Sequence, residues 1–356
     1  MIELNKNRRI NFYGINDQNE ANPAYQRGMQ LIKDGNWEYG FYLHELRSLP
    51  NLVAPQGVKS EFDKMPLWIP GMDATGWNVV VWCEAGWGDM IQFSRFIPLL
   101  KQAGVKKVKL AFPRPMIKLL RRLENHDGFY DFSEPFPRTI RVKVMSLPYF
   151  LMEHGVLSAE PVEHIYGSAG IFRNADVVKE VTAKPRIGYC HTTTNQSWNR
   201  IAKMMPRDIM ENFIKAHPEF EWVNLQQEGG VITSDLWTDT ADIVQKLDGV
   251  ISVDSAIAHI AGSVGVPVAN LIGQEKYACW RWYPKGTTTY WYDTMKTVWF
   301  KTWDEGLNEA IKHFKTEEIC NALDISRNKR PTKTNTRGST TGATRSNKRG
   351  ASRDVQ

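Results

Sequence analysis

The segment at 250–267, VISVDSAIAHIAGSVGVP, has the pattern of a buried strand that runs directly into a short helix. Three of its first four residues, Val250, Ile251 and Val253, form the short β-branched run expected of a strand covered on both faces. Asp254 or Ser255 is a good N-cap for the helix that follows, and a second apolar run at 268–272 predicts the next strand. A strand, helix and strand of this length imply a right-handed parallel crossover.

The start of this helix is a candidate anion-binding position. Backbone N–H groups without partners and a partial positive charge gather there, at the carboxyl edge of the sheet, and phosphate binds readily at such a place. The residues placed around it are Asp254, Ser255, Ala256 and, one turn later on the same face, His259. The alternative, which this segment alone favours, is that Asp254 only caps the helix and His259 is a packed or surface histidine.

A second strand-to-helix corner lies in the first half of the chain. The run NVVVWC at 78–83 predicts another buried strand. The turn EAGWGD at 84–89 follows, and 90–102 then shows a mixed helical and apolar pattern. Because two such corners lie in separate halves of the chain, the anion-binding interpretation of the 254–259 corner gains support over simple capping and packing.

The turn of the second corner is rich in glycine. Gly86 and Gly88 let the backbone approach a ligand closely, and Asp89 falls at the helix start, where the helix dipole favours an ionised carboxylate. Ile91 stands where a dinucleotide-binding fingerprint requires a third glycine, and no Gly-Lys-Ser/Thr follows, so neither a Rossmann fingerprint nor a Walker loop is present.

The residues EAGWGDMIQFSRF at 84–96, the segment at 250–267 and Trp-Arg-Trp at 280–282 resemble the glycosyltransferase family 9-like proteins. These are relatives of the lipopolysaccharide heptosyltransferases, and many of them follow tetratricopeptide repeats. The resemblance covers roughly 68–314. It implies an α/β fold of the GT-B type, in which two Rossmann-like domains face each other across a cleft. The first domain would hold mainly the acceptor, and the second the nucleotide-sugar donor.

Four parts are expected along the chain. They are a helical extension at 1–65 with one tetratricopeptide-like hairpin, an acceptor domain at 66–165, a donor domain at 166–325 and a disordered basic tail at 326–356. One hairpin cannot bury its own apolar face, so it should pack on the transferase or on a partner.

Strand and helix patterns alternate in both halves, as expected for α/β domains. Further strands are predicted at 106–112, 142–145, 186–190 and 222–226, and helices at 115–123, 206–216, 238–247 and 303–314. The resemblance implies that the last of these helices crosses back to the first domain.

The positive charge of the chain is concentrated in its tail. The last 31 residues hold nine of the 45 Lys and Arg and one of the 39 Asp and Glu, so the remainder has 36 basic and 38 acidic residues. A tail of this composition cannot build a core, and its charge would hold a polyanion through salt-sensitive phosphate contacts. A tail that only improves solubility, with no partner, is an equal alternative.

No cofactor or metal is expected, and the nucleotide-sugar is a co-substrate. The four cysteines are widely separated without metal-ligand spacing, and their use suits a reducing, cytoplasmic setting. We expect neither a signal peptide nor a transmembrane run, and the alternatives to a free cytoplasmic location are a membrane-peripheral or nucleic-acid-associated one. The absence of Asp-x-Asp speaks against a metal-bound diphosphate.

The resemblance implies a mechanism with named residues. Asp89 would accept the proton of the acceptor hydroxyl, and single displacement would invert the anomeric centre. Lys203, with Arg200 as second candidate, would stabilise the leaving diphosphate together with the residues around 254–259. Gln226 and Glu228 would hold ribose or base. The competing interpretations are a helix cap for Asp89 and exposed loop side chains for the others.

The chain departs from the family pattern near its third motif. Cys279 stands where these proteins usually have Asp, and Asp293 and Lys296 replace a common Pro and Arg, which leaves the donor sugar and base open. Trp280 and Trp282 would stack on a sugar or base, or pack in the core, which is the commoner use of tryptophan.

Three functions are compatible with these patterns. The first is transfer of a sugar to a cell-surface glycan, which the resemblance favours. The second is transfer to a hydroxymethylated DNA base, with the basic tail on the DNA backbone. The third is a catalytically silent scaffold of GT-B fold, against which the intact Asp89 and 254–259 segments argue.

Overall fold

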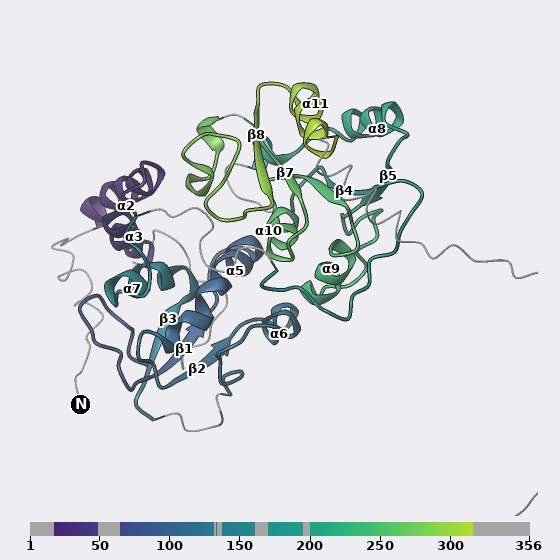
Figure 1. Ribbon diagram of the computed structural model, residues 1–356. Coiled ribbons are helices and arrows are strands. Elements are labelled where there is room, and N and C mark those ends of the chain that lie inside the picture. The colour runs from purple at the N-terminus through teal and green to yellow at the C-terminus, as the bar shows by residue number, and fades with distance from the viewer. Residues whose placement is uncertain are drawn as a thin grey trace, which may run out of the picture.

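The computed structural model describes residues 18–48, 65–131, 133, 137–160, 170–194, 200–273 and 275–315 (Figure 1). Two parallel β-sheets form the centres of two α/β units. The first sheet has the order β2-β1-β3, from β1 (Asn78–Trp82), β2 (Lys107–Ala111) and β3 (Thr139–Lys143). The second has the order β5-β4-β6-β7-β8, from β4 (Arg186–Cys190), β5 (Glu221–Asn224), β6 (Gly249–Val253), β7 (Val268–Gly273) and β8 (Met295–Phe300). The α/β class with two Rossmann-like units is confirmed.

In the first unit, proline decides where the helix after β1 changes type. The helix α5 (Trp87–Phe93) is followed by the 3-10 helix η2 (Ser94–Lys101), where one α-helical pattern at 90–102 was predicted. Pro98 lies inside η2, lacks a backbone N–H and would crowd the carbonyl four residues earlier in an α-helix. The helices α6 (Arg114–Leu120) and α7 (Leu147–Glu153) complete the unit.

The third strand of this unit begins three residues earlier and ends two residues earlier than predicted. β3 ends at Lys143, and the short 3-10 helix η3 (Val144–Ser146) begins immediately after it. There the backbone N–H of Met145 donates to the buried Glu84 carboxylate, at 3.2 Å. The predicted bounds of 142–145 are therefore wrong. The strand ends at Lys143, where the chain enters η3 and the Met145 N–H bonds to Glu84 instead of a neighbouring strand.

In the second unit, α8 (Arg207–Ala216), α9 (Trp237–Val244), α10 (Ala256–Ser263) and α11 (Trp303–Phe314) surround the five-stranded sheet. α11 packs on β7, β8 and α8. Its Phe314 lies against Gly249, where a Cβ would be 2.3 Å from the ring. The expectation that this helix crosses back to the first unit is wrong for the described residues, since its apolar face is part of the second unit's own core.

The helices α2 (Gln18–Lys33) and α3 (Trp37–His44) form a packed pair at the outer end of the first unit (Figure 1). Glycine permits their close approach, because a Cβ on Gly28 would lie 2.8 Å from Leu43 Cβ and 3.0 Å from the Gly40 carbonyl oxygen. The 3-10 helix η1 (Glu45–Ser48) follows. The pair packs on the rest of this chain, as shown by the stack of Trp37 on Trp291 at 5.5 Å between ring centroids.

Several sequence expectations concern residues outside the described ranges. The proposed domain boundary at 165–166 lies within 161–169, and the tail at 326–356 lies beyond residue 315. The same holds for 1–17 and 49–64 of the extension. Within the described ranges, none of the helices has both the length and the apolar character needed to span a membrane.

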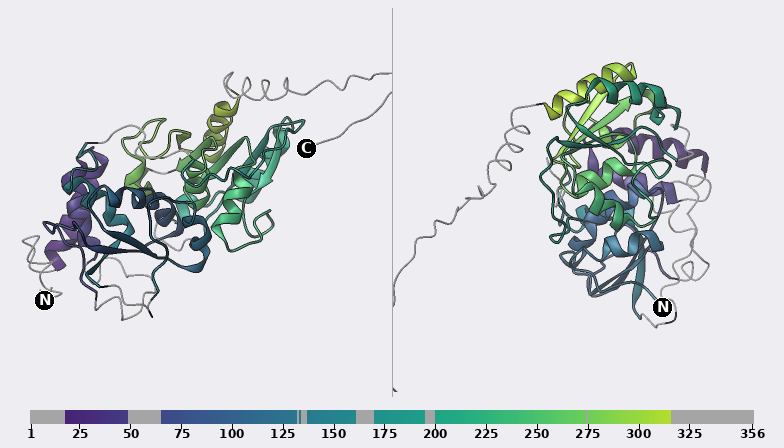
Figure 2. Two further views of the ribbon diagram at one scale, coloured as in Figure 1. Left: turned by 60° about the horizontal axis from the view of Figure 1, so that its bottom comes forward. Right: turned by 90° about the vertical axis from the view of Figure 1, so that its right-hand side faces the viewer.

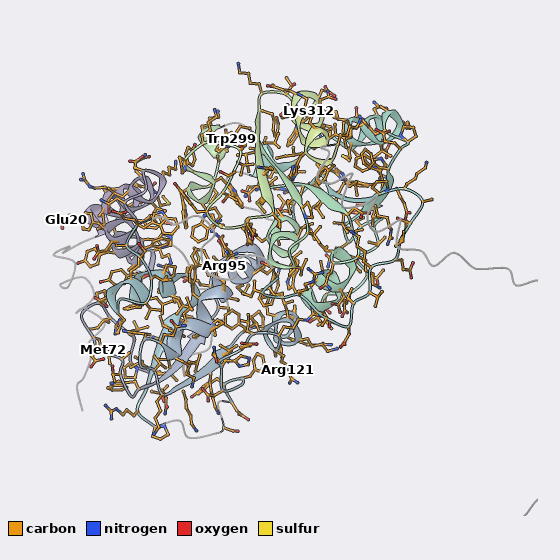
Figure 3. The ribbon with its side chains drawn as sticks, in the orientation of Figure 1. Glu20, Met72, Arg95, Arg121, Trp299 and Lys312 are labelled. Carbon is orange, nitrogen blue, oxygen red and sulfur yellow. The ribbon has the colours of Figure 1, made fainter. Side chains whose placement is uncertain are left out.

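The right-hand view of Figure 2 shows the two units one above the other, and their helices are in contact. α5 contacts α10, and α6 contacts α9. An ion pair between Arg122 and Asp242, at 2.7 Å, also joins them. Arg95 lies near the middle of the molecule (Figure 3) and donates from η2 to the backbone carbonyl of Trp291 in the second unit. These contacts bring the carboxyl ends of β1 and β6 to the same region.

Candidate functional site

The first corner holds Asp89 in a defined orientation. Gly86 is the N-cap of α5, and its backbone N–H donates to Asp89 Oδ2 at 2.9 Å. Ala85 has a φ of 59°, a left-handed conformation that turns the chain sharply between β1 and α5. The carboxylate is partly exposed, so Asp89 both caps its helix and presents an oxygen to the region between the units. The two sequence interpretations of Asp89 are compatible.

The second corner contains a buried ion pair. Lys203, from the 3-10 helix η4 (Arg200–Lys203), lies 2.8 Å from Asp254 Oδ2 at the end of β6. Burial by itself would raise the pKa of Asp254, but the Lys203 ammonium lowers it to about 2. Burial likewise opposes the charge of Lys203, whose pKa is nevertheless raised by Asp254. Both groups are therefore charged at neutral pH.

The N-cap of α10 is Ser255, and its hydroxyl makes no capping hydrogen bond. Instead Ser255 Oγ lies 3.1 Å from Ser252 Oγ and 3.7 Å from the Cys190 thiol. The first turn of α10, which begins at Ala256, thus has no side-chain cap and lies beside the Lys203–Asp254 pair. This is a suitable position for a phosphate group.

His259 connects the two corners. A Cβ on Gly88 would lie 2.6 Å from His259 Cδ2 and 3.2 Å from Nε2, so only glycine lets α5 approach the imidazole this closely. The ring stacks on Trp282 at 5.4 Å, and Nδ1 lies 2.9 Å from the Tyr292 hydroxyl. Burial, aided by the Arg281 charge, lowers the pKa of His259 to about 3. The imidazole is neutral at physiological pH.

The neutral state of His259 predicts a dependence of stability on pH. The imidazole has a pKa of about 6.5 in the unfolded chain and about 3 in the folded one. Between these values the unfolded state binds the extra proton, so stability is complete above pH 6.5 and falls as the pH is lowered. Urea unfolding at pH 7, 6, 5 and 4 measures this effect. As the pH falls, the free energy of unfolding should decline more steeply for the wild type than for His259→Gln, by about 1.4 kcal/mol per pH unit. Parallel curves would contradict this assignment.

Arg281 is a site residue to which sequence reasoning assigned no role. It lies in the 3-10 helix η6 (Trp280–Trp282) of the second unit, and its Nη2 donates to Asp89 Oδ1 of the first unit, 192 residues away. Nη1 is 3.1 Å from the Cys279 thiol. Burial by itself would lower the pKa of Arg281, but Cys279, Asp89 and Asp254 raise it. The sequence signal for this residue is the Trp-Arg-Trp motif at 280–282.

Both tryptophans of this motif are buried, in agreement with the packing interpretation. Trp280 contacts Phe41 and His44 of the helical extension, with ring centroids 5.9 and 5.5 Å away, and Trp282 stacks on His259. The extension thus supports the segment that carries Arg281. A sequence pattern could not show this, because the two segments are far apart in the chain.

Three further predicted site residues, Arg200, Gln226 and Glu228, lie in the second unit. Arg200 begins the 3-10 helix that ends at Lys203 and is half-buried. Gln226 Oε1 accepts from the backbone N–H of His191, at 3.3 Å, and so connects the loops after β5 and β4. Glu228 is exposed. All three lie in segments that follow the carboxyl ends of β4 or β5, and Lys203 forms the ion pair with Asp254.

The described residues form no recognisable metal-binding site. No group of three or more His, Cys, Asp and Glu side chains lies close enough there to hold an ion. Cys83, Cys190 and Cys279 are free thiols. Burial raises the pKa of both Cys190 and Cys279, which keeps these thiols protonated.

No protein-family model matches this sequence, and no curated protein matches it. Among solved structures, the chain is similar to E. coli heptosyltransferase WaaC with ADP-2-deoxy-2-fluoro heptose, at 12% identity and a TM-score of 0.43, covering 68% of this chain and 99% of that one. A glycosyl transferase of family 9 from Veillonella parvula has 11% identity, a TM-score of 0.41 and coverages of 72% and 99%. The dodecameric glycosyltransferase TibC from enterotoxigenic E. coli has 15% identity, a TM-score of 0.42 and coverages of 72% and 78%. No residue role is transferred at such low identity.

Proposed function

We propose that this protein is an inverting glycosyltransferase that moves a sugar from a nucleotide-sugar donor to an acceptor hydroxyl without a metal ion. The observation that carries the proposal is the meeting of the two corners. A carboxylate on α5 of one unit adjoins a helix start with a buried Lys203–Asp254 pair in the other, and His259 lies against Gly88 between them. One corner supplies a base and the other a place for phosphate.

The chemistry requires both corners at once. Asp89 takes the proton of the acceptor hydroxyl while its oxygen forms a bond to the anomeric carbon. The bond between that carbon and the phosphate oxygen breaks, and the electron pair leaves with the nucleoside diphosphate. Lys203 and the uncapped first turn of α10 stabilise the developing negative charge. Attack on the side opposite the leaving group inverts the configuration.

The neutral His259 contributes differently from a cation. Its low pKa makes it unsuited to supply positive charge to a diphosphate. It can instead donate one neutral hydrogen bond, and its packing on Trp282 keeps the ring in place. The roles of Arg200, Gln226 and Glu228 in holding donor phosphate, ribose or base belong to the same proposal. They rest on the position of Arg200 in η4, beside Lys203 in the chain, and of Gln226 and Glu228 after β5.

A cell-surface glycan is the proposed acceptor, and the protein would act in the cytoplasm or at the membrane surface. The specific observation in favour of the alternative, a modified DNA base, is the charge of the last 31 residues, with nine Lys or Arg and one Asp. Duplex DNA should then bind at low salt and lose affinity steeply as salt increases. If the chain ending at residue 325 binds DNA equally well, or neither form binds, the DNA alternative is rejected.

Thermal unfolding in the presence of UDP-, GDP-, ADP- and CMP-sugars tests the donor proposal. A donor at 100 times its Kd should stabilise the fold by about 2.7 kcal/mol, because it binds only the native state. Lys203→Met should reduce this shift, whereas Lys312→Met, at an exposed lysine of α11, should leave it unchanged. If none of the four donor classes raises the Tm at millimolar concentration, the protein is not a nucleotide-sugar transferase and the scaffold alternative is favoured.

A further inference from the structure

The guanidinium of Arg281 is held by an unusually weak set of partners for a buried cation. Its side chain is 10% exposed and makes one strong contact, with the Asp89 carboxylate. Its second contact is to the Cys279 thiol, a weak acceptor that burial keeps protonated. Its Nε is buried and has no hydrogen-bond partner in the part of the chain that the structure describes. Such a donor is costly to leave unpaired.

The charges around this guanidinium balance without a ligand. Asp89 and Asp254 are paired with Arg281 and Lys203, and the buried His259 is neutral. The buried Arg95, whose charge also acts on His259, donates to the Trp291 carbonyl. A nucleoside diphosphate that enters the site adds negative charge beside two ion pairs that are already balanced. Unless a cation changes its partner, the new charge is not compensated in a region where water is largely excluded.

Of the two ion pairs, the one with Asp89 is the easier to separate. The Asp89 side chain is 19% exposed, whereas that of Asp254 is 9% exposed, so water can replace the partner of Asp89 more readily. The pair between Lys203 and Asp254 also lies within one unit, while Arg281 reaches across to the other. Arg281 is therefore the cation free to change partner.

We propose that Arg281 moves from Asp89 to the diphosphate of the bound donor, and that this exchange frees Asp89 to act as the base. The inference rests on the proposed function. Arg281 is then a residue that touches the leaving group, and the nucleoside diphosphate supplies the acceptors that Nε and the thiol-facing Nη1 lack. The acceptor hydroxyl can be deprotonated only once the donor is in place, which protects the enzyme from acting on one substrate alone.

Isothermal titration calorimetry with inorganic pyrophosphate, ADP and UDP tests this exchange on the full chain. Asp89→Asn should bind these ligands roughly tenfold more tightly than the wild type, because Arg281 no longer has a competing carboxylate. Arg281→Met should bind roughly tenfold less tightly. In the Arg281→Met background, Asp89→Asn should change affinity by less than about threefold.

A second pair between the units provides the matched control. Arg122 and Asp242 also join the units at 2.7 Å but lie between α6 and α9. Asp242→Asn should therefore leave pyrophosphate affinity unchanged. An equal gain in Asp242→Asn would mean that loosening the units, and not the release of Arg281, strengthens binding, and this would overturn the inference.

Three further outcomes separate this inference from the proposed function. If Asp89→Asn strengthens binding equally with and without Arg281, simple removal of a repelling charge explains the gain, and the exchange is rejected. If the wild type binds a ligand but Asp89→Asn gains nothing, the exchange is rejected while the donor site stands. If the wild type binds none of the three ligands, both proposals fall. Arg281→Lys, which keeps the charge but loses the fork of donors, replaces Arg281→Met if that variant does not fold.

Discussion

Asp89→Asn is expected to slow sugar transfer by about 10²- to 10⁴-fold, the usual contribution of a general base. The amide has the shape of the carboxylate, but it cannot take the proton of the acceptor hydroxyl. It keeps an oxygen that can accept from the Gly86 backbone N–H, now at 2.9 Å from Oδ2, so the turn before α5 should be retained. The rate of donor consumption with acceptor present, measured for the donor found by thermal unfolding, reports the change.

A slower Asp89→Asn variant could have lost either its base or its fold, and three measurements separate these causes. The Tm of Asp89→Asn should remain close to that of the wild type. Asp242→Asn should retain full activity, since it removes a comparable carboxylate from another ion pair between the units. Asp89→Asn should also bind pyrophosphate more tightly while transferring less, a combination that an unfolded or distorted variant would not show. Transfer at more than a tenth of the wild-type rate would mean that another group is the base.

Glu84→Ala is expected to lower the free energy of unfolding by about 3–5 kcal/mol, as found when one partner of a buried ion pair is removed. The Glu84 carboxylate accepts from Arg47 Nη2 at 2.5 Å and Nε at 3.1 Å, and Lys143 Nζ lies 3.6 Å away. Arg47 also pairs with Glu45 at 2.7 Å, and all four side chains are buried. Without Glu84, Arg47 keeps its ion pair with Glu45 but loses two hydrogen bonds, and Lys143 loses the carboxylate 3.6 Å away.

Urea unfolding measures this loss, with Glu309→Ala as the matched control. Glu309 pairs with Lys312 on the exposed side of α11 at 2.7 Å, and an exposed pair contributes about 0–1 kcal/mol. Glu84→Gln, which keeps the hydrogen-bonding shape, should cost less than Glu84→Ala. A loss below about 1 kcal/mol for Glu84→Ala would show that water reaches Arg47 and that the helical extension is not anchored through this network.

This network gives the helical extension its place in the molecule. Arg47 lies in η1, which directly follows α3, and Glu84 follows β1, five residues before Asp89. On its other side the extension packs on Trp280 and Trp291, beside Arg281. The extension therefore contacts the segments on both sides of the Asp89–Arg281 pair. The sequence predicted only that a single hairpin must pack its apolar face on some other surface.

The local elements could be predicted because their signals lie in consecutive residues. The β-branched run before Asp254 and the helix at 303–314 follow from periodicity alone, and α11 has the predicted bounds. The strand β8 (Met295–Phe300) was missed, since Lys296 and a half-exposed edge position blur its pattern. The predicted packing of α11 on the first unit was wrong. It was inferred from the resemblance, whereas the helix packs on β7 and β8 of its own unit.

The amino-acid order by itself determined two strand-to-helix corners, the glycines that open the first of them and the residues Asp89 and His259 as candidates, because strand burial, caps and turns depend on neighbours in the chain. Lys203 became a candidate only through the resemblance to a known family. Only the tertiary structure decided that Arg281 pairs with Asp89, that Tyr292 contacts His259 and that α5 adjoins α10. Such partners depend on how two separately formed sheets and their helices pack. Periodicity contains no information on which distant side chains that packing brings within a few ångströms of each other.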